Sequence, residues 1–316
     1  MSSDPQVKAW LQGLEDSGLP PLDEMSVADA RATFEAVVND CGIKPEPVAN
    51  ITDRTIPGPG GDIPIRIYTP EGGGVFPIIV YFHGGGWVIG NLEVVHGPCT
   101  LLANRAQAVV VSVDYRKGPE HPFPAAVDDA FAATKWVADS ASLLSGDSQR
   151  IAVAGDSAGG NLSAVVALMA RDAGYPQVTY QMLFYPATDA ARETASYREN
   201  SEGHFLTGNL IKWFGQHYLG DDADVTDWRI SPLLVADVTG VAPAHVITAE
   251  FDPLRDEGEA YAERLREAGI MATVERYDGQ IHGFSASLAG VMDQGRKSLE
   301  DAGQKLRDAL QAGREA

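Results

Sequence analysis

The pattern of apolar and polar positions changes character at about residue 49. Before that point, residues 4–16 and 26–38 repeat apolar side chains every three or four positions, as an amphipathic helix does. The first segment places four such side chains on one face: Val7, Trp10, Leu11 and Leu14. Ser26 followed three residues later by Asp29 is a capping-box pattern that predicts the start of the second helix. Two N-terminal helices are therefore expected.

Beyond residue 49 the chain alternates short apolar runs with segments of helical periodicity. The runs cover residues 63–70, 76–82, 108–115, 151–155, 180–186, 245–250 and the more polar 272–279. The helical segments include residues 124–138, 157–173 and 254–269. Apolar strands that alternate with helices predict an α/β fold with a mainly parallel sheet covered on both faces. The polar run at 272–279 is typical of an exposed edge strand.

The alternation breaks between residues 187 and 242, where one clear amphipathic helix, GNLIKWFGQHY (208–218), stands among irregular sequence. We interpret this stretch as an insertion over the sheet, which could form a lid with the N-terminal helices. The predicted organisation is N-terminal cap helices at 1–48, a catalytic domain at 49–186 and 243–316, and a cap insertion at 187–242.

The composition indicates which classes of partner the protein can bind and in which compartment it is expected. The 316 residues carry 24 Lys and Arg against 44 Asp and Glu, a net charge of −20, which argues against nucleic acid and anionic membranes as partners. No signal-peptide pattern opens the chain and no apolar run is long enough to span a membrane. The two cysteines, Cys41 and Cys99, make neither a disulfide framework nor a zinc set. A cytoplasmic protein without a metal site is expected.

The sequence GDSAGG (155–160) follows an apolar run and opens a helical segment. A Gly155-x-Ser157-x-Gly159 pattern at a strand-to-helix junction predicts a strained turn that lifts the Ser157 hydroxyl above the carboxyl edge of the sheet. The structural alternative is a serine N-cap with small packing neighbours. We interpret Ser157 as a nucleophile.

A serine nucleophile needs a base, and the base needs an orienting acid. In this fold the order is serine, acid, histidine, and His282 is the one histidine that follows the run at 245–250. The loop and helix start after that run offer four acids: Glu250, Asp252, Asp256 and Glu257. Asp252 is preferred because it lies in the loop itself, before Pro253, a good first helical residue. Its expected role is to fix the imidazole tautomer and stabilise the imidazolium.

The run YFHGGGWVIG (81–90) places three consecutive glycines behind an apolar strand. Acyl transfer builds negative charge on an oxygen, which is best met by preset backbone N–H donors. The N–H of Ala158 should be one donor, and the glycine loop at 84–86 should supply the others. A flexible linker is the alternative, although Trp87 and Val88 follow at once and would anchor the loop.

These motifs resemble the hormone-sensitive-lipase-like (bacterial family IV) carboxylesterases of the α/β-hydrolase superfamily. The resemblance runs through HGGGW, DYRKGPEHPFPAAVDDA (114–130), GDSAGG, YPATD (185–189), DPLRDEG (252–258) and IHGF, over roughly residues 50–290. It implies an eight-stranded α/β-hydrolase sheet with a helical cap, and a triad of Ser157, Asp252 and His282. It also implies oxyanion donors at Gly85, Gly86 and Ala158 (with Gly84 possible), and a supporting role for His83. Lys117-Gly118 replaces the apolar pair usual in the family.

The resemblance predicts hydrolysis of small, short-chain carboxylic esters through an acyl-serine, without metal or organic cofactor. Family members often pair through the last strand, so residues 272–279 are a predicted homodimer contact. The expected substrate pocket draws on five side chains: Trp87, Phe205, Leu206, Trp213 and Phe214. For Trp213 and Phe214, simple packing of the cap helix is an equal alternative. An amidase, lactonase or carbohydrate deacetylase with the same triad, or a non-catalytic small-molecule receptor, remain the other functions.

Overall fold

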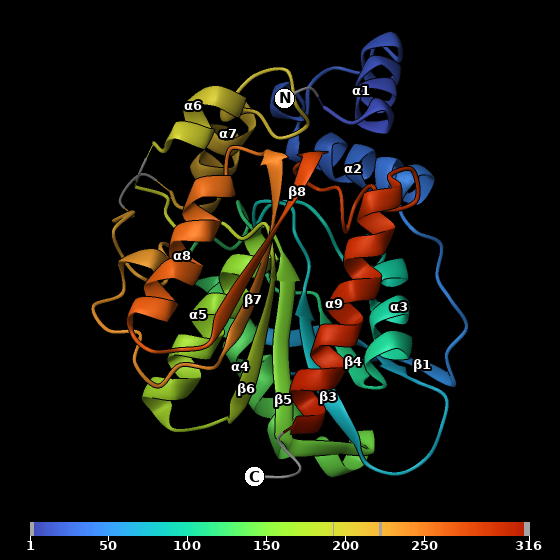
Figure 1. Ribbon diagram of the computed structural model, residues 1–316, viewed down its shortest axis with the longest axis vertical. Coiled ribbons are helices and arrows are strands. Elements are labelled where there is room, and N and C mark those ends of the chain that lie inside the picture. The colour runs from blue at the N-terminus through green and yellow to red at the C-terminus, as the bar shows by residue number, and fades with distance from the viewer. Residues whose placement is uncertain (1–2, 192, 221–222, 313–316) are drawn as a thin grey trace.

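An eight-stranded sheet organises the computed structural model, which describes residues 3–191, 193–220 and 223–312 (Figure 1). The strands are β1 (Asn50–Gly58), β2 (Gly61–Thr69), β3 (Phe76–Phe82), β4 (Val109–Val113), β5 (Gly146–Asp156), β6 (Val178–Phe184), β7 (Ala244–Phe251) and β8 (Ala272–Ile281). Their order is β1-β2-β4-β3-β5-β6-β7-β8. Pairs involving β2 are antiparallel and all other pairs are parallel. The predicted eight-stranded, mostly parallel sheet is confirmed.

Helices cover both faces of this sheet. The α-helices are α1 (Pro5–Asp16), α2 (Val27–Cys41), α3 (His96–Ala106), α4 (Ala125–Asp139), α5 (Ala158–Ala173), α6 (Ala195–Asn200), α7 (Gly208–Tyr218), α8 (Arg255–Glu267) and α9 (Asp293–Ala312). Short 3₁₀ turns lie at η1 (Leu22–Glu24), η2 (Ala141–Leu144) and η3 (Pro232–Leu234). Figure 1 shows α3 and α9 on one face and α4, α5 and α8 on the other. This double cover explains why β4 is buried along its whole length.

Some elements do not follow from the patterns singled out in the sequence. β1 is largely exposed, so it lacks the alternation of apolar and polar residues that marks a half-buried strand. α3 is largely buried, so it lacks the single apolar face that marks an amphipathic helix. α9 does carry a helical apolar stripe, at Leu299, Leu306 and Leu310, although it is not among the helical segments predicted above. The expectation that Pro253 opens a helix is wrong, because α8 begins at Arg255.

The N-terminal helices and α6–α7 lie over the carboxyl end of the sheet (Figure 1). α1 is fixed by the N–H of Asp4, which donates to Gly279 O at 2.9 Å, and by Trp10 Nε1, which donates to Cys41 Sγ at 3.3 Å. Residues 223–242 instead run beside the body, where Arg264 donates to the carbonyls of Leu233 and Val235. The boundaries of a cap at 1–48 and 187–242 stay a prediction.

The helices of residues 3–191, 193–220 and 223–312 are those of a protein body without a membrane span. None of these helices combines the length and apolar character needed to cross a bilayer. α9, which has 20 residues, is amphipathic, since Lys297 and Asp301 pair on the face opposite its buried leucines. No group of three or more His, Cys, Asp or Glu side chains among these residues could hold a metal ion.

Candidate active site

Ser157 sits at the turn between β5 and α5. Its backbone has φ 56° and ψ −116°, a conformation that residues other than glycine rarely adopt. Two hydrogen bonds hold the turn: the N–H of Ser157 donates to Phe184 O at 2.9 Å, and the N–H of Asn161 donates to Ser157 O at 3.0 Å. The serine is therefore presented at the carboxyl end of the sheet on a strained but well-anchored backbone.

The glycines on both sides of Ser157 are required by close approach. A Cβ on Gly155 would lie 2.4 Å from the carbonyl carbon of Gly159, and a Cβ on Gly159 would lie 1.9 Å from Phe82 O. These neighbours are backbone atoms of a central strand and a helix, which cannot move aside as a flexible side chain can. The Gly-x-Ser-x-Gly spacing thus reflects the tightness of the turn.

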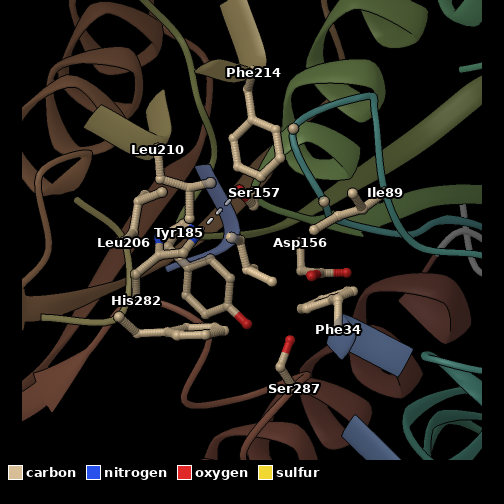
Figure 2. A pocket seen from close by; sticks show the side chains of 15 residues that line it. Phe34, Ile89, Asp156, Ser157, Tyr185, Leu206, Leu210, Phe214, His282 and Ser287 are labelled. Carbon is tan, nitrogen blue, oxygen red and sulfur yellow. Dashed lines mark hydrogen bonds between the residues drawn. The ribbon is translucent and has the colours of Figure 1, made fainter. Parts of the chain in front are cut away.

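The structure brings Ser157, His282 and Asp252 together in one chain of hydrogen bonds. His282 Nε2 lies 2.9 Å from Ser157 Oγ, and His282 Nδ1 lies 2.8 Å from Asp252 Oδ2. Figure 2 marks the first of these bonds. The second oxygen of Asp252 accepts from the N–H of Leu254 at 2.8 Å, so the fully buried carboxylate is held at both oxygens. This is the geometry of a nucleophile, a base and an orienting acid.

The other acids considered in the sequence have different partners. Glu250 accepts from the N–H of Gly279 at 2.7 Å, and Asp256 accepts from the N–H of Ser196 at 2.7 Å. Glu257 accepts from the N–H of Thr188 at 2.7 Å. Each of the three carboxylates therefore fixes a backbone segment rather than the imidazole.

The glycine loop lies beside Ser157, and its backbone N–H groups are either hydrogen-bonded within the protein or free. The N–H of Gly84 donates to Asp156 Oδ1 at 3.0 Å, so it is not free to meet a substrate oxygen. Within residues 3–191, 193–220 and 223–312, the N–H groups of Gly85, Gly86 and Ala158 have no acceptor. The expectation for Gly84 as an alternative donor is therefore wrong, whereas the other three amides are available.

His83 and Asp156 fix the shape of this loop. His83 Nδ1 lies 2.7 Å from Gly84 O, and its buried ring stacks on Tyr115 with centroids 4.3 Å apart. Asp156 Oδ1 accepts from Tyr81 Oη at 3.0 Å as well as from Gly84. Complete burial raises the pKa of Asp156, which these two donors oppose. The residue before the nucleophile thus ties the serine turn to the glycine loop, a contact that the sequence analysis did not identify.

A small cavity of about 40 Å³ opens onto Ser157 and His282 (Figure 2). Of the predicted pocket residues, Phe205, Leu206 and Phe214 line it. Phe214 lies against the glycine loop, since a Cβ on Gly86 would meet its ring at 2.1 Å. The cavity is also lined by residues that the sequence analysis missed, including Leu22, Phe34, Ile89, Tyr185, Leu210 and Ser287.

Trp87 and Trp213 do not lie among the residues that line this cavity. The ring of Trp87 stacks on Tyr218 with centroids 4.6 Å apart, and Trp213 packs edge-on against Phe214 and His217. The stack of Trp87 on Tyr218 therefore fixes the end of α7 to the segment after the glycine loop, whereas the ring contacts of the buried Trp213 lie within α7. For Trp213 the geometry matches the packing alternative considered in the sequence, and the expectation that Trp87 lines the pocket at Ser157 is wrong.

Glu257 is a fully buried carboxyl close to the triad, and it gives a test of pH dependence. Burial raises its pKa to about 8, the charges of Asp189 and Asp252 act in the same direction, and the N–H groups of Thr188 and Asp189 oppose them. Because the folded-state pKa lies above the ordinary value of 4.5, the unfolded chain releases this proton first as the pH rises. The stability present below pH 4.5 is then lost towards pH 8.

We expect Glu257→Gln to flatten that loss, which amounts to about 1.4 kcal/mol per pH unit at most. Denaturant unfolding of both proteins between pH 5 and pH 8 measures the slope, with the exposed Glu267→Gln on the same helix as control. Parallel curves for wild type and Glu257→Gln would show that Glu257 ionises normally in the folded state.

Comparisons with known proteins agree with this geometry. A family model described as the alpha/beta hydrolase fold matches residues 79–286. The carboxylic ester hydrolase LipN of Mycobacterium tuberculosis is 45% identical over 286 residues, which cover 86% of this chain and 74% of LipN. An arylesterase of Saccharolobus solfataricus is 35% identical over 288 residues, 91% of this chain and 94% of that protein.

A solved structure extends the agreement to three dimensions. The hyperthermophilic esterase of the archaeon Pyrobaculum calidifontis is 44% identical, with a TM-score of 0.92 over 98% of this chain and 100% of that one. The strand order, the serine turn and the sequence relatives all indicate the same family. The chain therefore belongs to the α/β-hydrolase family, among its hormone-sensitive-lipase-like carboxylesterases.

Proposed function

We propose that this protein hydrolyses carboxylic esters through an acyl-serine intermediate. The observation that carries the proposal is the continuous chain from Ser157 Oγ through both nitrogens of His282 to Asp252. The relatives named as ester hydrolases and esterases support it from outside the structure.

In the first half of the reaction, Ser157 Oγ attacks the ester carbonyl while His282 Nε2 takes the hydroxyl proton. The carbonyl oxygen becomes an oxyanion, and the free N–H groups of Gly85, Gly86 and Ala158 are placed to receive it. Each such donor is worth roughly 3–4 kcal/mol in the transition state. Asp252 holds the imidazole with Nδ1 protonated, which leaves Nε2 able to accept.

In the second half, the bond to the leaving alcohol breaks and the alcohol oxygen takes the proton from His282. Water then attacks the acyl-serine with His282 again as base, which releases the acid and regenerates Ser157. The small volume of the cavity at Ser157, about 40 Å³, supports short acyl groups.

The test compares purified protein on p-nitrophenyl acetate, butyrate and decanoate, and on p-nitroacetanilide. We expect fast release of nitrophenol from acetate and butyrate, slower release from decanoate, and far slower cleavage of the anilide. A preference for the anilide would favour the amidase alternative. Absence of turnover on every ester would contradict the proposal.

We also propose that the protein pairs through residues 272–279, as its relatives are expected to do. β8 supports this as the terminal strand of the sheet, because β7 is the one strand that pairs with it in the described part of the chain. Measurement of the oligomeric state in solution tests this proposal, because a monomer would contradict the pairing.

A further inference from the structure

A second and much larger cavity adjoins the cavity at Ser157. It measures about 770 Å³ and lies between α1, the η1–α2 segment and residues 203–210. We call it the outer groove. Its volume falls within the range of small-molecule sites, about 300–1,000 Å³, whereas the cavity at Ser157 is far smaller.

Resting on the proposed esterase function, we infer that the outer groove binds the alcohol half of esters whose alcohol is large and apolar. The preferred substrates would then be esters of a small acid with a bulky alkyl or aryl alcohol. This substrate class is narrower than that of a general short-chain esterase, and it follows from how the two cavities are joined.

The outer groove adjoins the active site at four side chains that line both cavities: Leu22, Phe34, Phe205 and Leu210. They come from η1, α2, the segment before α7, and α7 itself. A group that extends from the reacting carbon past these side chains would enter the outer groove.

The side on which the cavities meet indicates which half of the ester enters. The ring of Phe205 lies against Gly283, where an added Cβ would be 3.3 Å from Phe205 Cδ1. Gly283 follows His282, which gives its proton to the departing alcohol oxygen. In Figure 2, Leu210, which lines both cavities, lies on the same side as His282, whereas Phe34, which also lines both, lies beside Asp156 on the side of Ile89. The alcohol therefore leaves towards the Phe205–Leu210 side.

The walls of the outer groove suit an apolar group. Leu11, Leu14 and Val37 line it from α1 and α2, while Lys8 and Glu15 lie at its polar rim. Burying one methylene group is worth roughly a fourfold gain in affinity. An octyl chain that reaches the groove should therefore raise kcat/KM well above that of an ethyl chain.

The covalent chemistry is the same for every alcohol. The bond from Ser157 Oγ to the acyl carbon forms, the bond from that carbon to the alcohol oxygen breaks, and the alcohol takes the proton from His282. A bulky alcohol thus changes only acylation, since the acetyl-serine hydrolysed afterwards is identical across a series of acetates.

The experiment measures kcat/KM for ethyl, butyl and octyl acetate, and for ethyl octanoate as the reversed ester. In wild type, octyl acetate should exceed ethyl acetate by at least tenfold and ethyl octanoate should not. In a Leu11→Gln/Leu14→Gln variant, the octyl-to-ethyl acetate ratio should fall about tenfold. Leu143→Trp, at an exposed position on η2, should keep the wild-type ratio.

A second measurement needs no variant. 1-Octanol should inhibit ethyl acetate hydrolysis competitively at a concentration at least tenfold lower than 1-butanol does. An unchanged acetate ratio in the folded double variant, an effect confined to ethyl octanoate, or equal inhibition by the two alcohols would each overturn the inference. Loss of the underlying function is distinguishable, because wild type would then hydrolyse none of the esters.

Discussion

Replacing Ser157 with alanine is expected to lower the turnover of p-nitrophenyl acetate by about 10⁴–10⁶-fold. The hydroxyl lies 2.9 Å from His282 Nε2, and no other hydroxyl is bonded to that nitrogen among the residues that the structure describes. Without Oγ the imidazole can act only on water, while the free amides of the glycine loop still bind the oxyanion. Residual activity should therefore come from attack by water on a carbonyl whose developing charge these amides stabilise, without an acyl-serine.

Two controls separate this loss from misfolding. Ser142→Ala removes an exposed hydroxyl on η2, far from the site, and should keep wild-type turnover. A reactive phosphonate ester should add one phosphonyl group to wild type and to Ser142→Ala in the intact mass spectrum, and none to Ser157→Ala. Turnover within tenfold of wild type in a folded Ser157→Ala protein would rule out the acyl-serine mechanism.

Asp252→Asn should reduce kcat by about 10⁴-fold, the size of the effect that the corresponding change has in a serine protease. The asparagine amide can donate to His282 Nδ1, which would move the imidazole proton to Nε2. That tautomer cannot accept the proton of Ser157. The loss should appear in kcat with little change in KM, because Asp252 is fully buried behind His282 and does not line the cavity.

Glu250→Gln is the matched control, since this acid lies two residues before Asp252, within β7, and was a candidate in the sequence. Its carboxylate accepts from the N–H of Gly279 rather than from the imidazole. A loss of less than tenfold is expected. If Glu250→Gln lost activity as severely as Asp252→Asn, the assignment of the orienting acid would not stand.

The reacting groups could be predicted from the sequence because each one occupies a strict local pattern. A serine on a tight turn requires the neighbouring glycines, since added Cβ atoms at Gly155 and Gly159 would overlap backbone. The order serine, acid, histidine then leaves few candidates. The sheet could be predicted equally well, because strands covered on both faces form continuous apolar runs in the sequence.

The cavity walls could be predicted only in part, because they depend on which side of a helix faces the site. Trp213 and Phe214 are adjacent in α7, so their side chains point about 100° apart, and only Phe214 lines the cavity. Leu22 and Phe34 lie more than a hundred residues before Ser157. Nothing local in the sequence indicates that these two side chains reach the nucleophile.

The opposite placement of α1 and the end of α9 has a practical consequence for an immobilised biocatalyst. α1 borders the outer groove, whereas α9 ends at the other end of the sheet, below β5 in Figure 1. Attachment to a resin through the end of α9 should orient the substrate-binding side towards the bulk liquid. Attachment beside α1 should crowd the space through which bulky alcohols diffuse.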